Sequence, residues 1–101
     1  MKSYYKKKVV SAVDNVIGDI IDEILDKYYS DYVETKYEYE RLLYKIVERV
    51  KQEVFNNNAT PEDVIEYFKN LRSKKHQAKL VLSYLIAAAL EELEYKEVTS
   101  L

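Results

Sequence analysis

Apolar residues recur at helical spacing along most of the chain, and the longest apolar run lies near its C-terminus. From Leu80 to Leu90 every residue except Ser83 is apolar, and neither Gly nor Pro interrupts the run. Leu, Ala and Ile at this length are typical of a helix buried on most of its circumference. Eleven residues are too few to span a bilayer, which needs roughly 20. We therefore expect a helix over 77–95, followed by a frayed tail at 96–101.

This helix has two apolar faces on a helical wheel. The broad face, which is expected to form the core, carries Ala78, Leu82, Leu85, Ile86, Ala89 and Leu93. The second face consists of the small residues Ser83, Ala87 and Ala88. Because small side chains allow a short distance between helix axes, we expect that another helix can approach closely there.

Three more helices are predicted before this one, over residues 5–29, 36–55 and 61–72. Each combines apolar residues at helical spacing with charged residues on the remaining positions. Gly18, the single glycine, falls within the first helix and is expected to mark a mild bend. The short link after that helix favours an up-and-down connection to the second. Residues 1–101 are thus predicted to be one all-α domain, a small four-helix bundle-like fold with the fourth helix central.

Polar residues mark the ends of the inner helices. Thr35 stands three residues before Glu38, which is the spacing of a capping box. Thr60 is a good N-cap, and Pro61 suits the first helical position. Three consecutive asparagines at 56–58 predict the loop between the second and third helices.

The composition argues against several classes of function. The chain contains no cysteine, which excludes disulfides and thiolate metal sites. One glycine cannot form a glycine-rich phosphate loop, and the single His76 cannot form a two-histidine metal site. We expect no metal, no cofactor and no enzymatic activity. The apolar stretch after the N-terminal lysines is broken early by Asp14, so no secretory signal or membrane segment is predicted, and we expect a cytoplasmic protein. Abundant Lys, Glu, Ile and Val would suit a thermophile.

Charge is segregated along the chain, although the formal net charge is only −2. Residues 14–40 contain nine acids and two lysines, whereas residues 69–79 contain five basic residues and no acid. Such asymmetry hints at partners of opposite charge. The candidate phosphate-binding residues are Lys69, Arg72, Lys74, Lys75 and Lys79. They surround the start of the last helix, whose free N–H groups also favour a phosphate. The competing interpretation is a solvated basic turn.

Six of the eleven tyrosines lie between Tyr28 and Tyr44, and five of these six are in the acidic segment. Exposed tyrosine is favoured at protein interfaces because it combines contact area with a hydroxyl group. The candidate interface residues are Tyr28, Tyr32, Tyr37 and Tyr39. We expect a homo-oligomer, in its simplest form a homodimer, or a basic protein partner at this acidic face. The carboxylates of the first helix are interpreted as a solvated face and not as a cation site.

The order of elements over residues 35–95 resembles the N-terminal helical, SAM-like core-binding domain of tyrosine recombinases. The resemblance is carried by a helix with Thr35, Tyr39 and Leu43, by the Thr-x-Glu-Asp-Val helix from Thr60 to Phe68, and by the basic loop and apolar helix from Lys74 to Leu93. Gln77 and Lys79 stand where the family usually has Ser or Thr and Arg. The catalytic domain of the family has no counterpart in this sequence. The resemblance therefore implies a DNA-contacting module without strand-cleaving chemistry.

Two functional hypotheses follow. The first is a small non-enzymatic accessory or regulatory protein that contacts the phosphates of DNA or another nucleic acid through the basic turn. The second is a homo-oligomeric structural or protein-binding helical module that uses the tyrosine-rich acidic face.

Overall fold

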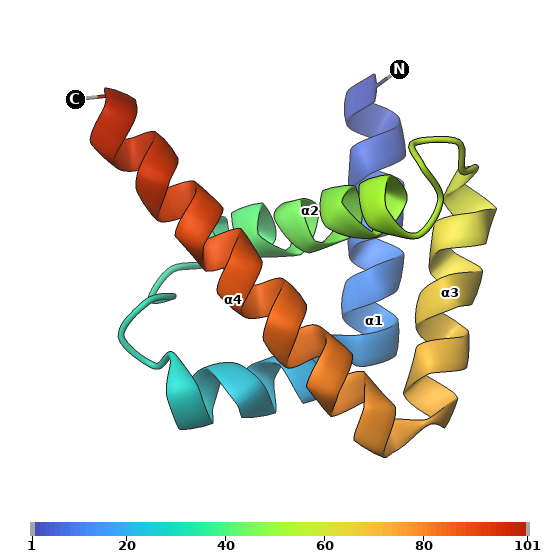
Figure 1. Cartoon of the computed structure of the whole chain (residues 1–101), viewed down its shortest axis with the longest axis horizontal. Coiled ribbons are helices and arrows are strands. Elements are labelled where there is room, and N and C mark those ends of the chain that lie inside the picture. The colour runs from blue at the N-terminus through green and yellow to red at the C-terminus, as the bar shows by residue number, and fades with distance from the viewer. Residues whose placement is uncertain (1, 101) are drawn as a thin grey trace.

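The computed structural model describes residues 2–100, with side chains described over 7–94, as four helices and no strand. The helices are α1 (Lys2–Tyr28), α2 (Lys36–Glu53), α3 (Pro61–Ser73) and α4 (Lys75–Ser100). They pack into one compact body in which α1, α2 and α4 cross one another and α3 closes one side (Figure 1). The predicted all-α fold with four helices is confirmed.

The main differences from the predicted boundaries concern α4. This helix begins at Lys75 and runs to Ser100, whereas the prediction was 77–95 with a frayed tail. Neither Gly nor Pro follows Pro61, so no residue of the last segment is a strong helix breaker. Lys74 is the only residue between α3 and α4, with φ −110° and ψ 65°. The corner between these two helices is therefore very short.

Local signals at the inner helix ends behave as predicted. The Thr35 hydroxyl accepts a hydrogen bond from the Glu38 amide at 3.1 Å, and the Glu38 carboxylate accepts one from the Thr35 amide at 3.2 Å. Thr60 forms the same reciprocal box with Asp63. Two of the loop asparagines, at 56 and 57, adopt positive φ angles of 53° and 65°, a conformation that asparagine tolerates better than most residues.

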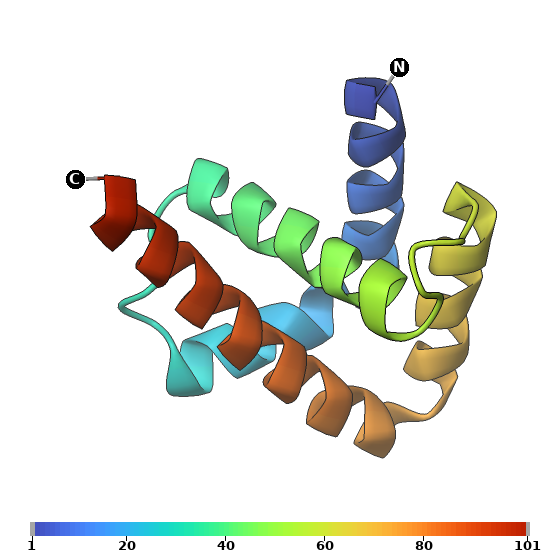
Figure 2. The same ribbon diagram turned by 45° about the horizontal axis from the view of Figure 1, so that its top comes forward.

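α1 is not straight. Its N-terminal part crosses behind α2, and near residue 20, by the colour of the ribbon, the helix turns so that its last part runs roughly opposite to α2 (Figures 1 and 2). Gly18 is buried close to this bend. The Val16 carbonyl, in the same region, accepts a hydrogen bond from the Arg72 guanidinium. A side chain that engages a carbonyl within a helix is a recognised cause of kinks, so the mild bend predicted at Gly18 is here a marked one.

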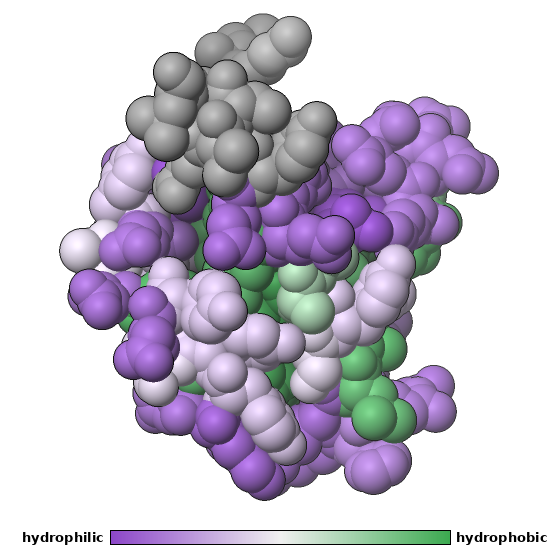
Figure 3. Space-filling view, turned by 60° about the vertical axis from the view of Figure 1, so that its left-hand side comes forward, coloured by the Kyte–Doolittle hydropathy of each residue, from purple (hydrophilic) through white to green (hydrophobic). Residues whose placement is uncertain are grey.

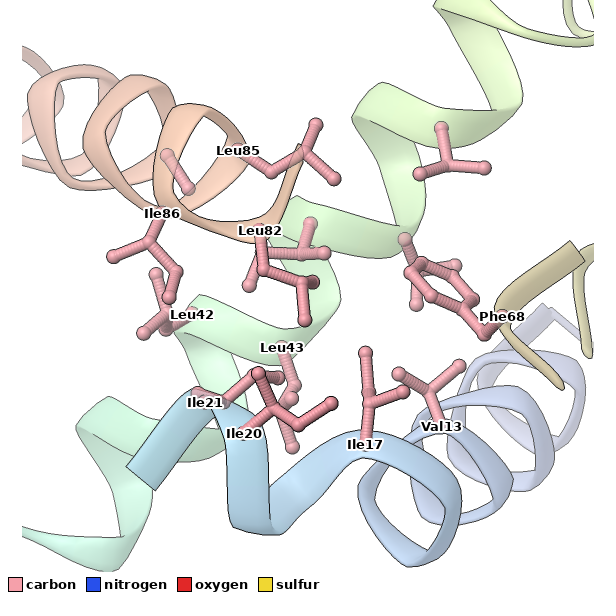
Figure 4. Packing of buried hydrophobic residues seen from close by; sticks show 14 of the residues in the cluster. Val13, Ile17, Ile20, Ile21, Leu42, Leu43, Phe68, Leu82, Leu85 and Ile86 are labelled. Atoms are coloured by element: carbon pink, nitrogen blue, oxygen red, sulfur yellow. The ribbon is translucent and has the colours of Figure 1, made fainter. Parts of the chain in front are cut away.

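The core lies where the four helices meet, and α1 is its largest contributor. Figure 4 shows apolar side chains from every helix pointing toward one another. The labelled residues are Val13, Ile17, Ile20 and Ile21 of α1, Leu42 and Leu43 of α2, Phe68 of α3, and Leu82, Leu85 and Ile86 of α4. All ten are buried. The predicted broad face of the last helix is therefore a core face, with Leu93 at its partly exposed end.

α4 contacts each of the other three helices, yet it is buried on one side only. Leu80, Tyr84 and Ala87 are exposed on its opposite side, and Ser83 and Ala88 are partly exposed. The expectation that this helix is buried on most of its circumference is thus wrong. The apolar run led to that expectation because apolar residues occupy both sides of the helix.

Candidate functional site

The five predicted phosphate-binding residues lie where α3 ends and α4 begins, and we call this group the basic corner (Lys69, Arg72, Lys74, Lys75 and Lys79). Arg72 faces the middle of α1. Its Nη1 donates to Asp19 Oδ1 at 2.7 Å and its Nη2 donates to Asp19 Oδ2 at 3.2 Å. The same Nη1 donates to the Val16 carbonyl. Arg72 therefore ties the corner to the bend of α1.

Lys79 is held in a similar way. Its Nζ lies 2.8 Å from Glu23 Oε1, one turn further along α1 than Asp19. The hydrogen bond from Arg72 lowers the pKa of Asp19, and the hydrogen bond from Lys79 lowers the pKa of Glu23. Acids of the first helix thus neutralise two of the five candidate phosphate contacts in space.

The other three lysines of the basic corner are exposed. Within the described side chains, Lys69, Lys74 and Lys75 have no ion-pair partner. Lys8 does not extend this positive surface, because its Nζ lies 3.9 Å from Glu62 Oε1 at the opposite end of α3. A helix of 13 residues separates the two regions by about 20 Å.

The four candidate interface tyrosines do not form one surface. Tyr28, Tyr32 and Tyr37 are 63%, 53% and 68% exposed around the loop between α1 and α2. Tyr39 is half-buried, and its hydroxyl donates to Asp14 Oδ1 of α1 at 2.8 Å. Burial, followed by this hydrogen bond, raises the pKa of the Tyr39 hydroxyl far above its usual value. Tyr39 thus joins α1 to α2 within the fold.

A hollow of about 500 Å³ opens beside the exposed tyrosines. Loop residues, the start of α2 and the end of α4 line it, and the lining includes Tyr32, Val33, Arg41 and Leu93. Figure 3 brings this left-hand side of the molecule forward and shows pale and green side chains in the middle of the face, between purple margins. The hollow has a mixed polar and apolar lining, but no geometry in it indicates a reaction.

The outer side of α4 forms a second surface, which sequence reasoning did not single out as a site. We call it the outer seam; its members are Gln77, Leu80, Tyr84, Ala87, Glu91 and Glu94, all exposed. Leu80 is 62% exposed and Tyr84 is 58% exposed. Only the small-residue face described in the sequence analysis pointed to this side. The apolar run did not predict the seam, because a continuous run of apolar residues does not show which side of the helix the other helices cover.

A contact from α2 orients Tyr84. Arg49 Nη2 donates to the Tyr84 hydroxyl at 3.4 Å, and the guanidinium carbon lies 5.8 Å from the ring centroid. Glu53 holds Arg49 in turn through an Arg49 Nη2 to Glu53 Oε1 distance of 2.6 Å. The Tyr84 ring is thus fixed at the surface by a cation–π contact.

The acidic face of α1 includes the two ion pairs described above and a carboxyl group, that of Asp22, with a raised pKa. Burial, followed by the nearby charges of Asp14 and Asp26, raises the pKa of Asp22. Across the part of the chain with described side chains, no cluster of His, Cys, Asp and Glu has an arrangement that could hold a metal ion. Among the described residues, no helix has both the length and the apolar character required to cross a membrane.

Comparison of the chain with known protein families, with curated proteins and with solved structures finds no match.

Proposed function

We propose that the chain is a protein-interaction module and that the outer seam of α4 is its binding surface. The observation that supports this proposal is the exposure of Leu80 and Tyr84, one helical turn apart, on a helix whose apolar residues continue through Ala87. A single exposed apolar side chain is ordinary. An aligned series on one helix face makes a continuous apolar strip, which is typical of a surface that binds another protein.

The chemistry of the strip suits a protein partner. Tyr84 has both a ring and a hydroxyl, and Arg49 already restricts its orientation. A partner therefore gains contact area at a small further cost in side-chain entropy. Gln77, Glu91 and Glu94 provide polar ends to the strip, as the rim of an interface requires.

Site-specific photo-crosslinking tests this function. A photoreactive residue at position 80 is expected to form protein adducts in cells that express the intact chain. The same residue at position 66, which is exposed on α3, provides the matched control. An Ala87→Glu substitution should abolish the adducts from position 80, because it places a charge in the middle of the strip. Adducts no more abundant at position 80 than at position 66 would contradict the proposal.

Nucleic-acid binding is the second candidate function, favoured by the three exposed lysines of the basic corner that lack an acidic partner among the described side chains. The resemblance of residues 35–95 to the recombinase core-binding domain supports the same candidate. We expect weak, sequence-tolerant binding to DNA, because few groups here are suited to reading base edges.

A triple substitution of Lys69, Lys74 and Lys75 by Ala tests this second candidate without disturbing Arg72 or Lys79. Binding of duplex DNA should weaken, and its log–log salt slope should fall by about 0.9 for each lost phosphate contact. Replacing the exposed Lys7, Lys27 and Lys36 by Ala provides a control with the same loss of three charges. Equal affinity and equal salt slope for the intact chain and the triple variant would remove nucleic acid from consideration.

A further inference from the structure

The outer seam has the spacing of a helix-pairing surface. Its exposed positions, 77, 80, 84, 87, 91 and 94, alternate steps of three and four residues. This alternation keeps one line of side chains facing a partner helix, as in a two-helix coiled coil. The small residues Ser83 and Ala88 flank the line, so the partner's backbone can come close. The expected occupant is therefore a helix that presents a similar line.

Side-chain size changes along the seam. The half nearer the start of α4 has the large residues Leu80 and Tyr84, whereas the next seam position is the small Ala87. Two copies of the seam in antiparallel orientation place Tyr84 of each copy against Ala87 of the other. A parallel arrangement instead sets Tyr84 against Tyr84 and leaves a gap at Ala87. Alternation of large and small residues across facing positions favours the antiparallel pair.

The distribution of charge along α4 also favours the antiparallel orientation. The exposed Lys74 and Lys75 lie at the start of the helix, and the exposed Glu91 and Glu94 follow the apolar run. Lys79 and Glu92 are paired within the fold, with Glu23 and Lys45 respectively, and do not count here. Antiparallel copies bring the basic end of each helix to the acidic end of the other, while parallel copies bring like charges together. The helix dipoles also oppose one another favourably in the antiparallel pair.

We propose that the partner of the outer seam is a second copy of this chain, packed antiparallel about a two-fold axis between Tyr84 and Ala87. This inference rests on the proposed function of the seam and adds the identity and the orientation of the partner. Such an interface is isologous, since the same residues of both copies contribute to it. The predicted tyrosine interface around Tyr28, Tyr32 and Tyr37 is not needed for this contact.

Cysteine crosslinking tests the orientation directly, because the chain has no cysteine of its own. Two single variants, Gln77→Cys and Glu94→Cys, are mixed as intact chains and oxidised. A disulfide requires Cα atoms about 4.4–6.8 Å apart, and antiparallel pairing brings position 77 of one copy next to position 94 of the other. We expect the mixed 77–94 product. Identical positions lie about 25 Å apart along the helices in this arrangement, so neither variant alone should crosslink.

Random collision is measured with Glu66→Cys, an exposed position on α3. A 77–77 product formed faster than the 66–66 product would show parallel pairing and overturn the orientation. A monomer in sedimentation of the intact chain, with no 77–94 product above the collision rate, would overturn the second copy as partner.

Two substitutions that add one negative charge to an exposed helical position complete the test. Ala87→Glu, in the seam, should convert the dimer to a monomer, whereas Asn70→Glu, on α3, should not. If the chain is a monomer and position 80 still forms adducts with another protein, the second copy is wrong while the proposed function stands. If position 80 forms adducts neither with a second copy nor with another protein, the proposed function and the second copy as partner are both wrong.

Discussion

Gly18 leaves space for a polar contact between α1 and α2. A Cβ atom added to Gly18 would lie 2.5 Å from Asp14 Oδ1 and 3.4 Å from the Tyr39 hydroxyl oxygen. Asp14 accepts its hydrogen bond from Tyr39 at the same place. The single glycine therefore leaves room for a carboxylate that joins α1 to α2. Its φ angle is not positive, so space and not backbone conformation explains the glycine.

A double-mutant cycle tests this explanation. Gly18→Ala should gain about 1 kcal/mol from helix propensity and lose about the same amount when the Asp14 carboxylate is pushed from Tyr39. The net change in the free energy of unfolding should be close to zero. In an Asp14→Ala background the same substitution should stabilise the chain by about 1 kcal/mol. Chemical denaturation measures both values, and equal effects of Gly18→Ala in the two backgrounds would refute the role given to Asp14.

Arg72 acts on the same helix from the other side. Its bond to the partly buried Val16 carbonyl should matter more than its exposed ion pair with Asp19, since exposed ion pairs contribute little. Arg72→Ala is expected to lower the free energy of unfolding by about 1–2 kcal/mol. Arg72→Lys should restore only part of this, because lysine lacks the planar fork that reaches both partners. Denaturation of the two variants measures the difference, and full rescue by lysine would argue against the carbonyl contact.

The contribution of Asp19 should depend on pH. Because Arg72 lowers the pKa of this carboxyl group from 3.8, the ionised form stabilises the fold above that pH. The contribution is lost as the pH falls through the lowered pKa of the folded state. The stability difference between the intact chain and Asp19→Asn should therefore be present at neutral pH and vanish in strong acid. A difference that grows as the pH falls below 3.8 would contradict the ion pair.

At the scale of the elements, local signals explain what could be predicted. The capping boxes at Thr35 and Thr60, the asparagine loop and the helical spacing of the core residues all act within a few positions of the chain. They predicted the number of helices and most of their ends. The contacts of Arg72 and Lys79 with α1 could not be predicted in this way, because each joins residues more than 50 positions apart. The pattern shows that charges are segregated, but not which acid will face which base.

In α4, too, the sequence pattern did not show which apolar residues are buried. Two of its leucines can be compared directly. Leu85 is 3% exposed, whereas Leu80 is 62% exposed. Leu85→Ala should lower the free energy of unfolding by about 2–5 kcal/mol through the cavity that it leaves. Leu80→Ala should change the stability of the monomer by under about 0.5 kcal/mol and weaken self-association instead. Denaturation at low protein concentration compares the two variants. A similar loss of stability in both would contradict the assignment of the core to the side of α4 that carries Leu85.

At the scale of the whole molecule, the distribution of charge explains why the basic corner supports only a second candidate function. The sequence separates acids from bases, but the fold brings α1 against the start of α4 and pairs part of each group. In the outer seam, Leu80 and Ala87 stay exposed, and Tyr84 stays largely exposed although Arg49 contacts it. The binding surface that we propose is thus the one that the fold leaves uncovered.

Self-association through the seam makes thermal stability depend on concentration. If only the folded chain dimerises, Tm should rise with protein concentration. This rise should be absent in Ala87→Glu and retained in Asn70→Glu. Added salt should reduce it, because the ends of the antiparallel helices attract one another through opposite charges. Calorimetry over a range of concentrations measures the effect, and a constant Tm for the intact chain would count against dimerisation.

The bend in α1 also has a consequence for the order in which contacts form while the chain is being synthesised. Synthesis proceeds from the N-terminus at about 5–20 residues per second, and Arg72 lies 56 positions after the Val16 carbonyl that it engages. The nascent α1 has no such partner until the α3–α4 corner has emerged. The contact between Arg72 and the Val16 carbonyl therefore forms only after residue 72 has been made, whereas α2, which also contacts α1, is complete earlier.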